Sequence, residues 1–103
     1  WESDYLGGLF KACHALDIPM VFDNMDTMPL TGNRPDKYEV AAAMSEAWIA
    51  FAQNGNPNHP GIPQWPPYTV DNRATMLFDV PSRVVVDPYR EELNAWEGID
   101  LRR

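Results

Sequence analysis

The strongest hydrophobic pattern in the chain lies between residues 36 and 53. Apolar side chains recur there at steps of three and four residues, the spacing that places them on one face of an α-helix. They are Val40, Ala43, Met44, Ala47, Trp48 and Phe51. Asp36 can cap the first turn, Glu39 can complete a capping-box-like pair, and Gly55 followed by Pro57 can end the helix. The pattern predicts a helix over residues 36–53.

Two short runs of β-prone residues follow in the second half of the chain. They cover residues 74–79 and 83–86, and the stretch Val80-Pro81-Ser82 between them is typical of a turn. We therefore expect a hairpin over residues 74–86. Asp87 can cap a following helix that has Pro88 at its first position, which predicts a last helix over residues 88–97. Taken alone, the chain is expected to be α+β.

The remaining segments carry weaker signals. Residues 15–22 fit either a short helix or an extended segment, because Pro19 excludes a long helix. Residues 23–35 are predicted to be a loop. Residues 55–73 are rich in Pro, Asn and Gly, and we expect an ordered loop there, pinned by Trp65 and Tyr68.

Length and charge narrow the classes of function. The 103 residues suffice for one small domain, taken as residues 1–103. A net charge of -7 argues against binding to nucleic acid or to anionic lipid surfaces. No apolar run reaches the roughly 20 residues of a membrane span. The single cysteine, Cys13, excludes a disulfide within the chain.

His14 is the best candidate for chemistry, because histidine moves protons near neutral pH. A lone histidine is also often structural, so both interpretations stay open at this point. No nucleophile accompanies it: Cys13 is its sequence neighbour, and neighbouring side chains usually diverge. The three serines lie outside any G-x-S-x-G motif. They are Ser3, Ser45 and Ser82.

The chain predicts no metal site and no cofactor. His14 and His59 lack the spacing of metal ligands. The acidic run that begins at Asp23 has Met28 and Arg34 where a calcium-binding EF-hand loop needs glycine and glutamate.

Four stretches, in order, resemble one known family. Residues 8–24, which contain Cys-His-Ala-Leu-Asp-Ile-Pro-Met-Val-Phe-Asp-Asn, resemble the histidine segment of type-B carboxylesterases, the family that includes the cholinesterases. Residues 44–58 are similar to a late helix of that family and its exit. Residues 65–68 and 73–79 are similar to the segments that come next. The resemblance covers nearly the whole chain.

The resemblance implies the C-terminal portion of an α/β-hydrolase. In that fold the triad runs Ser, then Asp or Glu, then His. A chain that starts just before the histidine then lacks the serine, the acid and the oxyanion-hole segment. His14 would be the general base. Asp17, where many members carry Glu, would be a local cap or a support near the histidine, not the triad acid. Residues 74–79 would form a late strand at the edge of the large central sheet.

Two interpretations of function follow from the resemblance. In the first, the parent protein hydrolyses small-molecule carboxylic esters. In the second, the chain is a non-catalytic structural or interaction module. Trp1 in place of an initiating Met favours a fragment, and we expect the isolated chain to be inactive. We also expect it to self-associate or to pair with the rest of the hydrolase domain. Ester specificity and a cytoplasmic or secreted location stay open.

Overall fold

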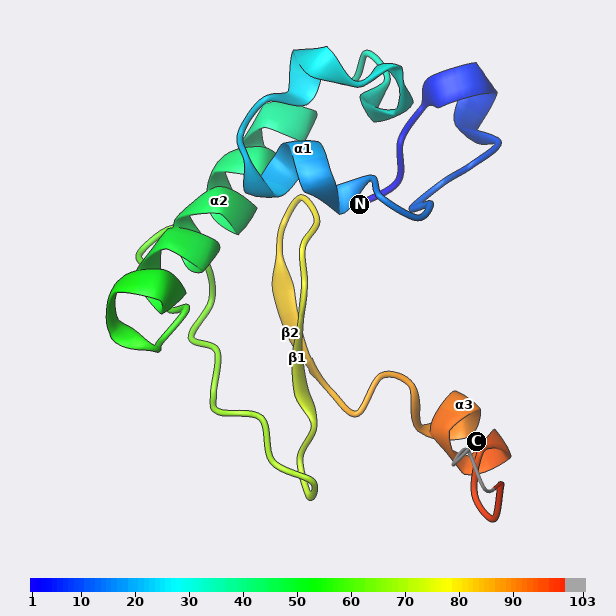
Figure 1. The fold of residues 1–103 in the computed structure, drawn as a ribbon, viewed down its shortest axis with the longest axis vertical. Helices are drawn as coiled ribbons and strands as arrows, with labels where there is room; N and C mark the ends of the chain where they lie inside the picture. Colours follow the sequence, from blue (N-terminus) through cyan, green and yellow to red (C-terminus); the bar gives the residue numbers. More distant parts are fainter. Residues whose placement is uncertain (100–103) are drawn as a thin grey trace.

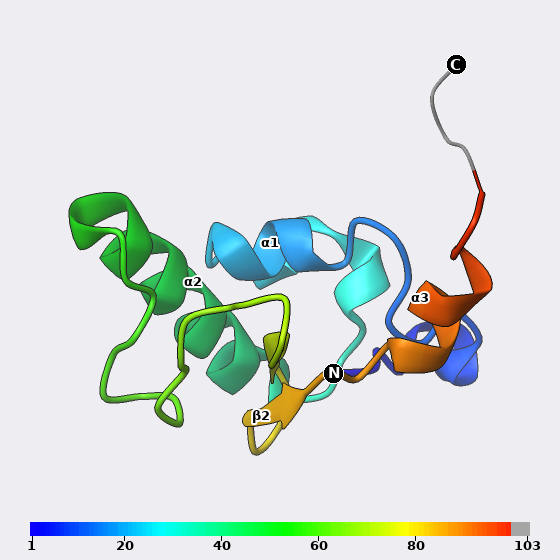
Figure 2. The same cartoon turned by 90° about the horizontal axis from the view of Figure 1, so that it is seen from below.

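The computed structural model of the chain describes residues 1–99. Figure 1 shows α1 lying across α2, a hairpin extending away from both, and α3 standing apart beyond the hairpin. Figure 2 shows the same separation of α3 from α2. The helices and strands are α1 (Asp17–Val21), α2 (Lys37–Asn54), β1 (Ala74–Leu77), β2 (Arg83–Val86) and α3 (Arg90–Ala95). Short 3₁₀ turns cover Tyr5–Gly8, Met25–Thr27 and Pro29–Thr31.

The long helix predicted over residues 36–53 is present as α2, displaced by one residue at each end. Its end follows the prediction, because Gly55 adopts a left-handed backbone and its N–H donates to the Phe51 carbonyl at 2.7 Å. The predicted cap is wrong, since Asp36 makes no side-chain capping bond. Its carboxylate instead accepts hydrogen bonds from Trp1 Nε1 at 3.2 Å and from Arg34 Nε at 3.1 Å.

The apolar stripe of α2 is covered along only part of its length. Its first half packs against α1, and Val40 is fully buried. The core cluster consists of Leu16, Met20, Met25, Val40 and Ala41. Further along, Trp48 is 59% exposed and Phe51 is 56% exposed. The hydrophobic pattern therefore identified a helix face of which residues 1–99 cover about half.

The predicted hairpin is present. β1 and β2 pair antiparallel, with Ala74 opposite Val86 and Leu77 opposite Arg83. The first strand ends at Leu77, two residues earlier than expected, because Asp79 enters the turn and exchanges hydrogen bonds with Ser82. In the described part of the chain the sheet has these two strands.

The loop between α2 and β1 is ordered, but only one of its two predicted anchors holds it. Trp65 Nε1 donates to the Ala74 carbonyl at 3.2 Å, and the Trp65 ring meets Phe78 edge-on. Tyr68 is 62% exposed, so its role as an anchor was predicted wrongly. The part of the loop near β1 is therefore anchored by Trp65, whereas the tip around Tyr68 is exposed to solvent.

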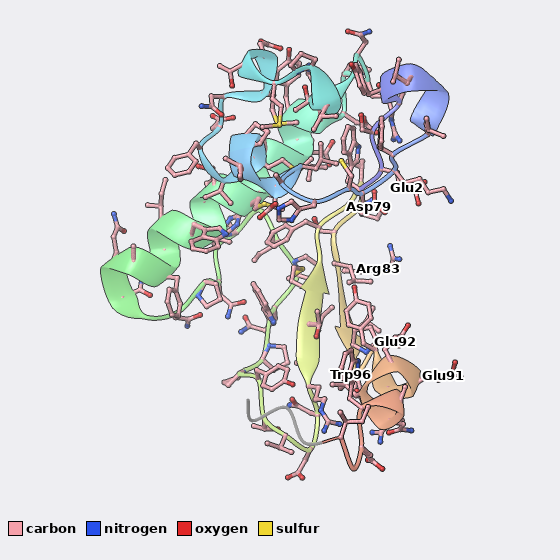
Figure 3. The ribbon with its side chains drawn as sticks, turned by 45° about the vertical axis from the view of Figure 1, so that its right-hand side comes forward. Glu2, Asp79, Arg83, Glu91, Glu92 and Trp96 are labelled. Carbon is pink, nitrogen blue, oxygen red and sulfur yellow. The ribbon has the colours of Figure 1, made fainter. Side chains whose placement is uncertain are left out.

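The last helix is shorter than the predicted 88–97, and Asp87 does not cap it. The Asp87 carboxylate pairs with Arg73 at 3.4 Å and with Arg90. α3 has no buried residue. The apolar side chains of the predicted helix are largely exposed, with Trp96 at 58% and Tyr89 at 54%; Figure 3 shows Trp96 beside the helix. None of the helices within residues 1–99 combines the length and apolarity of a membrane span.

Candidate active-site segment

His14 lies at the apex of a tight turn that leads into α1. The turn is closed by a hydrogen bond from the Leu16 N–H to the Cys13 carbonyl at 3.2 Å, which makes His14 and Ala15 its two central residues. Ala15 has a φ of 68°, in the left-handed region that non-glycine residues seldom adopt. The His14 side chain is exposed. The backbone therefore turns sharply and presents the ring outward.

The base of this turn is anchored in the core. Leu16 is only 4% exposed and belongs to the core cluster, and Cys13 packs against that cluster from its edge. α1 resolves the ambiguity over residues 15–22 in favour of a helix, with Pro19 buried in its middle. Since α1 packs on α2, the position of His14 is set by the contact between two helices.

The imidazole of His14 makes no hydrogen bond or ion pair with any residue in the range 1–99. A ring that is both exposed and unengaged has one nitrogen free to accept a proton and another free to donate one. This arrangement suits proton transfer to groups supplied from outside the described residues. It gives no sign of the buried, hydrogen-bonded state of a structural histidine.

Asp17 begins α1 and is exposed. It makes no side-chain cap, and within the described range it forms no hydrogen bond or ion pair with His14. The predicted cap is therefore absent. Its negative charge lies in the first helical turn, where the free N–H groups favour an anion. Its support of the histidine remains a prediction.

The structure gives the other candidate residues different surroundings. Ser3 is buried and donates to the Leu30 carbonyl at 2.5 Å, while Ser82 is engaged with Asp79. The His59 ring contacts Ala43, Glu46 and Gly61, and is not brought together with His14. Residues 1–99 contain no group of three or more His, Cys, Asp or Glu side chains able to hold a metal ion.

Two features of these sites could not be predicted from the sequence. One is the left-handed backbone of Ala15, where glycine would have been the signal. The other is the contact between His59 and Glu46, which depends on how the loop after α2 returns to the helix. No short-range spacing encodes either feature.

Comparison with known proteins confirms the resemblance to carboxylesterases. The model of the carboxylesterase family matches residues 3–96. The chain is 34% identical over 85 residues to the para-nitrobenzyl esterase of Bacillus subtilis (strain 168), covering 80% of this chain and 17% of that protein. It is 32% identical over 75 residues to the phenmedipham hydrolase of Pseudarthrobacter oxydans, covering 68% of this chain and 15% of that protein.

Solved esterase structures are also similar to the chain. An esterase from Clostridium hathewayi superposes with a TM-score of 0.80 at 35% identity, over 93% of this chain and 19% of that chain. A carboxylesterase of Geobacillus stearothermophilus superposes with a TM-score of 0.71 at 39% identity, over 82% of this chain and 19% of that chain. The chain thus spans about a fifth of the length of these α/β-hydrolase esterases, and it belongs to the carboxylesterase family.

Proposed function

We propose that this chain is the C-terminal portion of the α/β-hydrolase domain of a serine carboxylesterase, and that His14 is the histidine of the catalytic triad. The observation that carries the proposal is the exposed, unengaged ring of His14 at the apex of a turn anchored by Cys13 and Leu16. Family membership supports the reaction class. The C-terminal placement follows from the order of the triad, in which histidine comes last.

In this proposal His14 moves a proton in each half of the reaction. It takes the proton of a serine hydroxyl as the serine oxygen attacks the ester carbonyl, and it gives that proton to the departing alcohol. In the second half it takes a proton from water as the water oxygen attacks the acyl-enzyme, and it returns the proton to the serine. A carboxylate from outside the chain holds the ring in the required tautomer.

The same proposal makes the isolated chain inactive. The serine nucleophile and the oxyanion donors come from outside it, and these supply much of the rate enhancement of an acyl-transfer enzyme. Incubation of the chain with a short-chain nitrophenyl ester is expected to give only the rate of free imidazole. Turnover well above that rate, and lost in His14→Ala, would show that the chain carries a nucleophile of its own.

The role of His14 is tested in the full-length protein that contains this segment. His14→Gln is expected to lower kcat by about 10⁴-fold or more, because the triad acts as a unit. Asp71→Asn is the control, since it changes an exposed side chain away from the turn. A full-length His14→Gln enzyme with near-normal kcat would exclude His14 from the triad.

A second candidate is a non-catalytic interaction module. The observation that favours it is the apolar surface left open by residues 1–99, which includes Trp48, Phe51 and Trp96. On either interpretation this surface is expected to pair with the rest of the hydrolase domain. Ester turnover by the full-length protein that depends on His14 separates the enzyme from the module.

A further inference from the structure

The loop that follows α2 is closed on itself by one asparagine. Asn58 Nδ2 donates to the Trp65 carbonyl at 2.8 Å, and Asn58 Oδ1 accepts from the Trp65 N–H at 2.6 Å. These paired bonds make residues 58–65 a compact unit. Since the loop also supplies Trp65 to the wall of a groove of about 610 Å³ beside α2, its attachment to the helix affects the shape of that groove.

His59 joins this loop to α2. Its side chain is only 8% exposed, and its Nε2 lies 2.9 Å from the Ala43 carbonyl oxygen in the middle of the helix. A carbonyl oxygen can only accept, so Nε2 must carry a proton. The tautomer of the neutral ring is therefore determined: the hydrogen is on Nε2, and Nδ1 has a free lone pair.

Two groups compete for Nδ1. The Gly61 N–H lies 3.1 Å from it and needs that lone pair as an acceptor. Glu46 Oε2 lies 2.9 Å from the same nitrogen and needs a proton on it. One nitrogen cannot satisfy both at once. The geometry thus contains the partners of two protonation states of the ring.

Gly61 is the residue that permits this close approach. A Cβ at that position would lie 2.9 Å from His59 Cε1 and 3.0 Å from Nδ1. Any side chain there would push the ring away from its contacts. The glycine is therefore matched to the histidine two residues before it.

We propose that His59 and Glu46 form a protonation-dependent latch between the 58–65 loop and α2. With a neutral ring, His59 holds Gly61 within the loop and makes one bond to α2, at Ala43. When the ring takes a proton from solvent on Nδ1, the Gly61 bond breaks and Nδ1–H donates to Glu46, which gives the ring two bonds to α2.

Other charged groups face the same hollow, which has a volume of about 420 Å³. Glu39 lines it from α2 together with Glu46, and Asp79 lines it from the hairpin turn. Asp79 is paired with Arg83 at 3.7 Å. Within the described residues Glu46 alone makes ion-pair contact with the ring. Glu46 is therefore the acceptor that replaces Gly61.

Amide hydrogen exchange of the 103-residue chain at pH 8 and pH 5 tests the latch, read as protection relative to intrinsic rates. At pH 5 the protection of the Gly61 amide is expected to fall about fivefold, the equivalent of one hydrogen bond. The Ile62 amide, which donates to the His59 carbonyl at 3.3 Å, reports on the attachment of the loop. Its protection is expected to hold, because Glu46 replaces the lost bond.

Glu46→Ala and Glu39→Ala separate the latch from a general effect of charge. Both variants remove one carboxylate from the exposed side of α2 at the same hollow. In Glu46→Ala the protection of Ile62 is expected to fall with that of Gly61 at pH 5, whereas Glu39→Ala should behave as the parent chain. Equal behaviour of the two variants overturns the proposal, as does a Gly61 amide that does not respond to pH.

Discussion

Lys37 shows how one residue at the start of α2 controls its surroundings. The lysine side chain is 8% exposed, and its ammonium donates to the Gly32 carbonyl at 3.0 Å and lies 3.2 Å from Asp26 Oδ1. The Tyr38 hydroxyl donates to the same Asp26 oxygen at 2.7 Å. Hydrogen bonds from Tyr38 and Lys37 lower the pKa of Asp26. A buried cation and an exposed carboxylate thus stabilise each other.

The lowered pKa of Asp26 predicts part of the acid sensitivity of the chain. A depressed carboxyl pKa contributes stability above the unfolded-state value of about 3.9, and that contribution is lost as the pH falls through the folded-state value. Asp26→Asn is therefore expected to lower the melting temperature at neutral pH and to flatten its fall in acid. Asp71→Asn, an exposed carboxylate without an ion pair in residues 1–99, is the control and should change neither.

Gly32 is a second position where one residue decides the local structure. Its φ is 63°, and a Cβ there would lie 1.9 Å from Asp4 Oδ1, the atom that accepts the Asn33 N–H at 2.8 Å. Gly55 has a φ of 74° but has nothing within 4 Å of a Cβ. The two glycines also differ in ψ, which is -159° at Gly32 and 11° at Gly55, so an alanine at Gly32 meets both a greater backbone strain and a clash.

Alanine at each of these glycines is expected to destabilise the chain by different amounts. Gly55→Ala should cost about 1 kcal/mol, the strain of a left-handed alanine. Gly32→Ala should cost more, because the ψ of -159° there is less accessible to alanine and because the Cβ also displaces Asp4. Denaturant unfolding of both variants gives the comparison, and Asp4→Ala in the Gly32→Ala background should recover part of the difference. If Asp4→Ala recovers none of the loss, the clash with Asp4 does not contribute to the cost of Gly32→Ala.

At the scale of the element, α2 has two apolar regions with different partners. Val40 has no exposed surface and packs with α1, whereas Phe51 is 56% exposed. The periodic pattern could not separate them, because spacing alone reports which residues share a helix face. Whether that face is covered depends on what packs against it.

This difference in burial predicts that removing the smaller side chain, Val40, costs the isolated chain more stability than removing the larger one, Phe51. Val40→Ala is expected to lower the free energy of unfolding by about 2 kcal/mol, since it opens a cavity in the core. Phe51→Ala removes a larger side chain but should cost well under half as much. Urea unfolding followed by far-UV circular dichroism measures both. A larger loss for Phe51→Ala would place Phe51 in the core in solution.

The short elements also divide into features that local patterns predict and features that depend on other parts of the chain. The hairpin strands could be predicted from β-branched residues and a turn. The predicted caps at Asp36 and Asp87 failed, because Trp1 and Arg34 engage the carboxylate of Asp36 and Arg73 and Arg90 engage that of Asp87. Burial alone would raise the pKa of Asp36, but hydrogen bonds from Arg34 and Trp1 outweigh it and the pKa is lowered. Local capping rules cannot anticipate Trp1 and Arg73, which reach these carboxylates from distant positions in the chain.

At the scale of the whole molecule, the chain is more open than its length requires. Its radius of gyration is 15.5 Å, whereas a compact domain of about 100 residues has a value near 13 Å. Asp79, at the hairpin turn, lies near the N-terminal segment that carries Glu2 (Figure 3). Glu91 and Glu92 lie on α3, which Trp96 follows, beyond the other end of the hairpin. The open shape and the exposed aromatic residues are consistent with our proposal that the rest of a hydrolase domain covers this surface.

Salt is expected to promote self-association of the isolated chain. Exposed apolar surface favours association, whereas a net charge of -7 on each copy opposes it. Higher ionic strength screens the repulsion. Sedimentation velocity in about 0.02 M and about 0.5 M NaCl should therefore show more oligomer at the higher concentration.

The double variant Trp48→Ser/Phe51→Ser should weaken this association, because it removes two exposed aromatic side chains from α2. Ser82→Ala is the control, because that hydroxyl bonds within the hairpin turn and presents no apolar surface. A monomer at both salt concentrations would show that the apolar surface is too small or too dispersed to hold two copies together.

The sequence by itself determined the long helix, its glycine end and the hairpin, because these depend on periodicity and turn residues, and it singled out His14 as a candidate that stays a prediction. It also contained the resemblance that the family match confirmed. Only the tertiary structure decided which half of α2 is buried, which carboxylates the arginines bind, and that the left-handed backbone of Ala15 presents His14 outward. The burial of the first half of α2 depends on the packing of α1 against it, and the pairing of Arg73 with Asp87 depends on the closing of the hairpin, so neither follows from local sequence patterns.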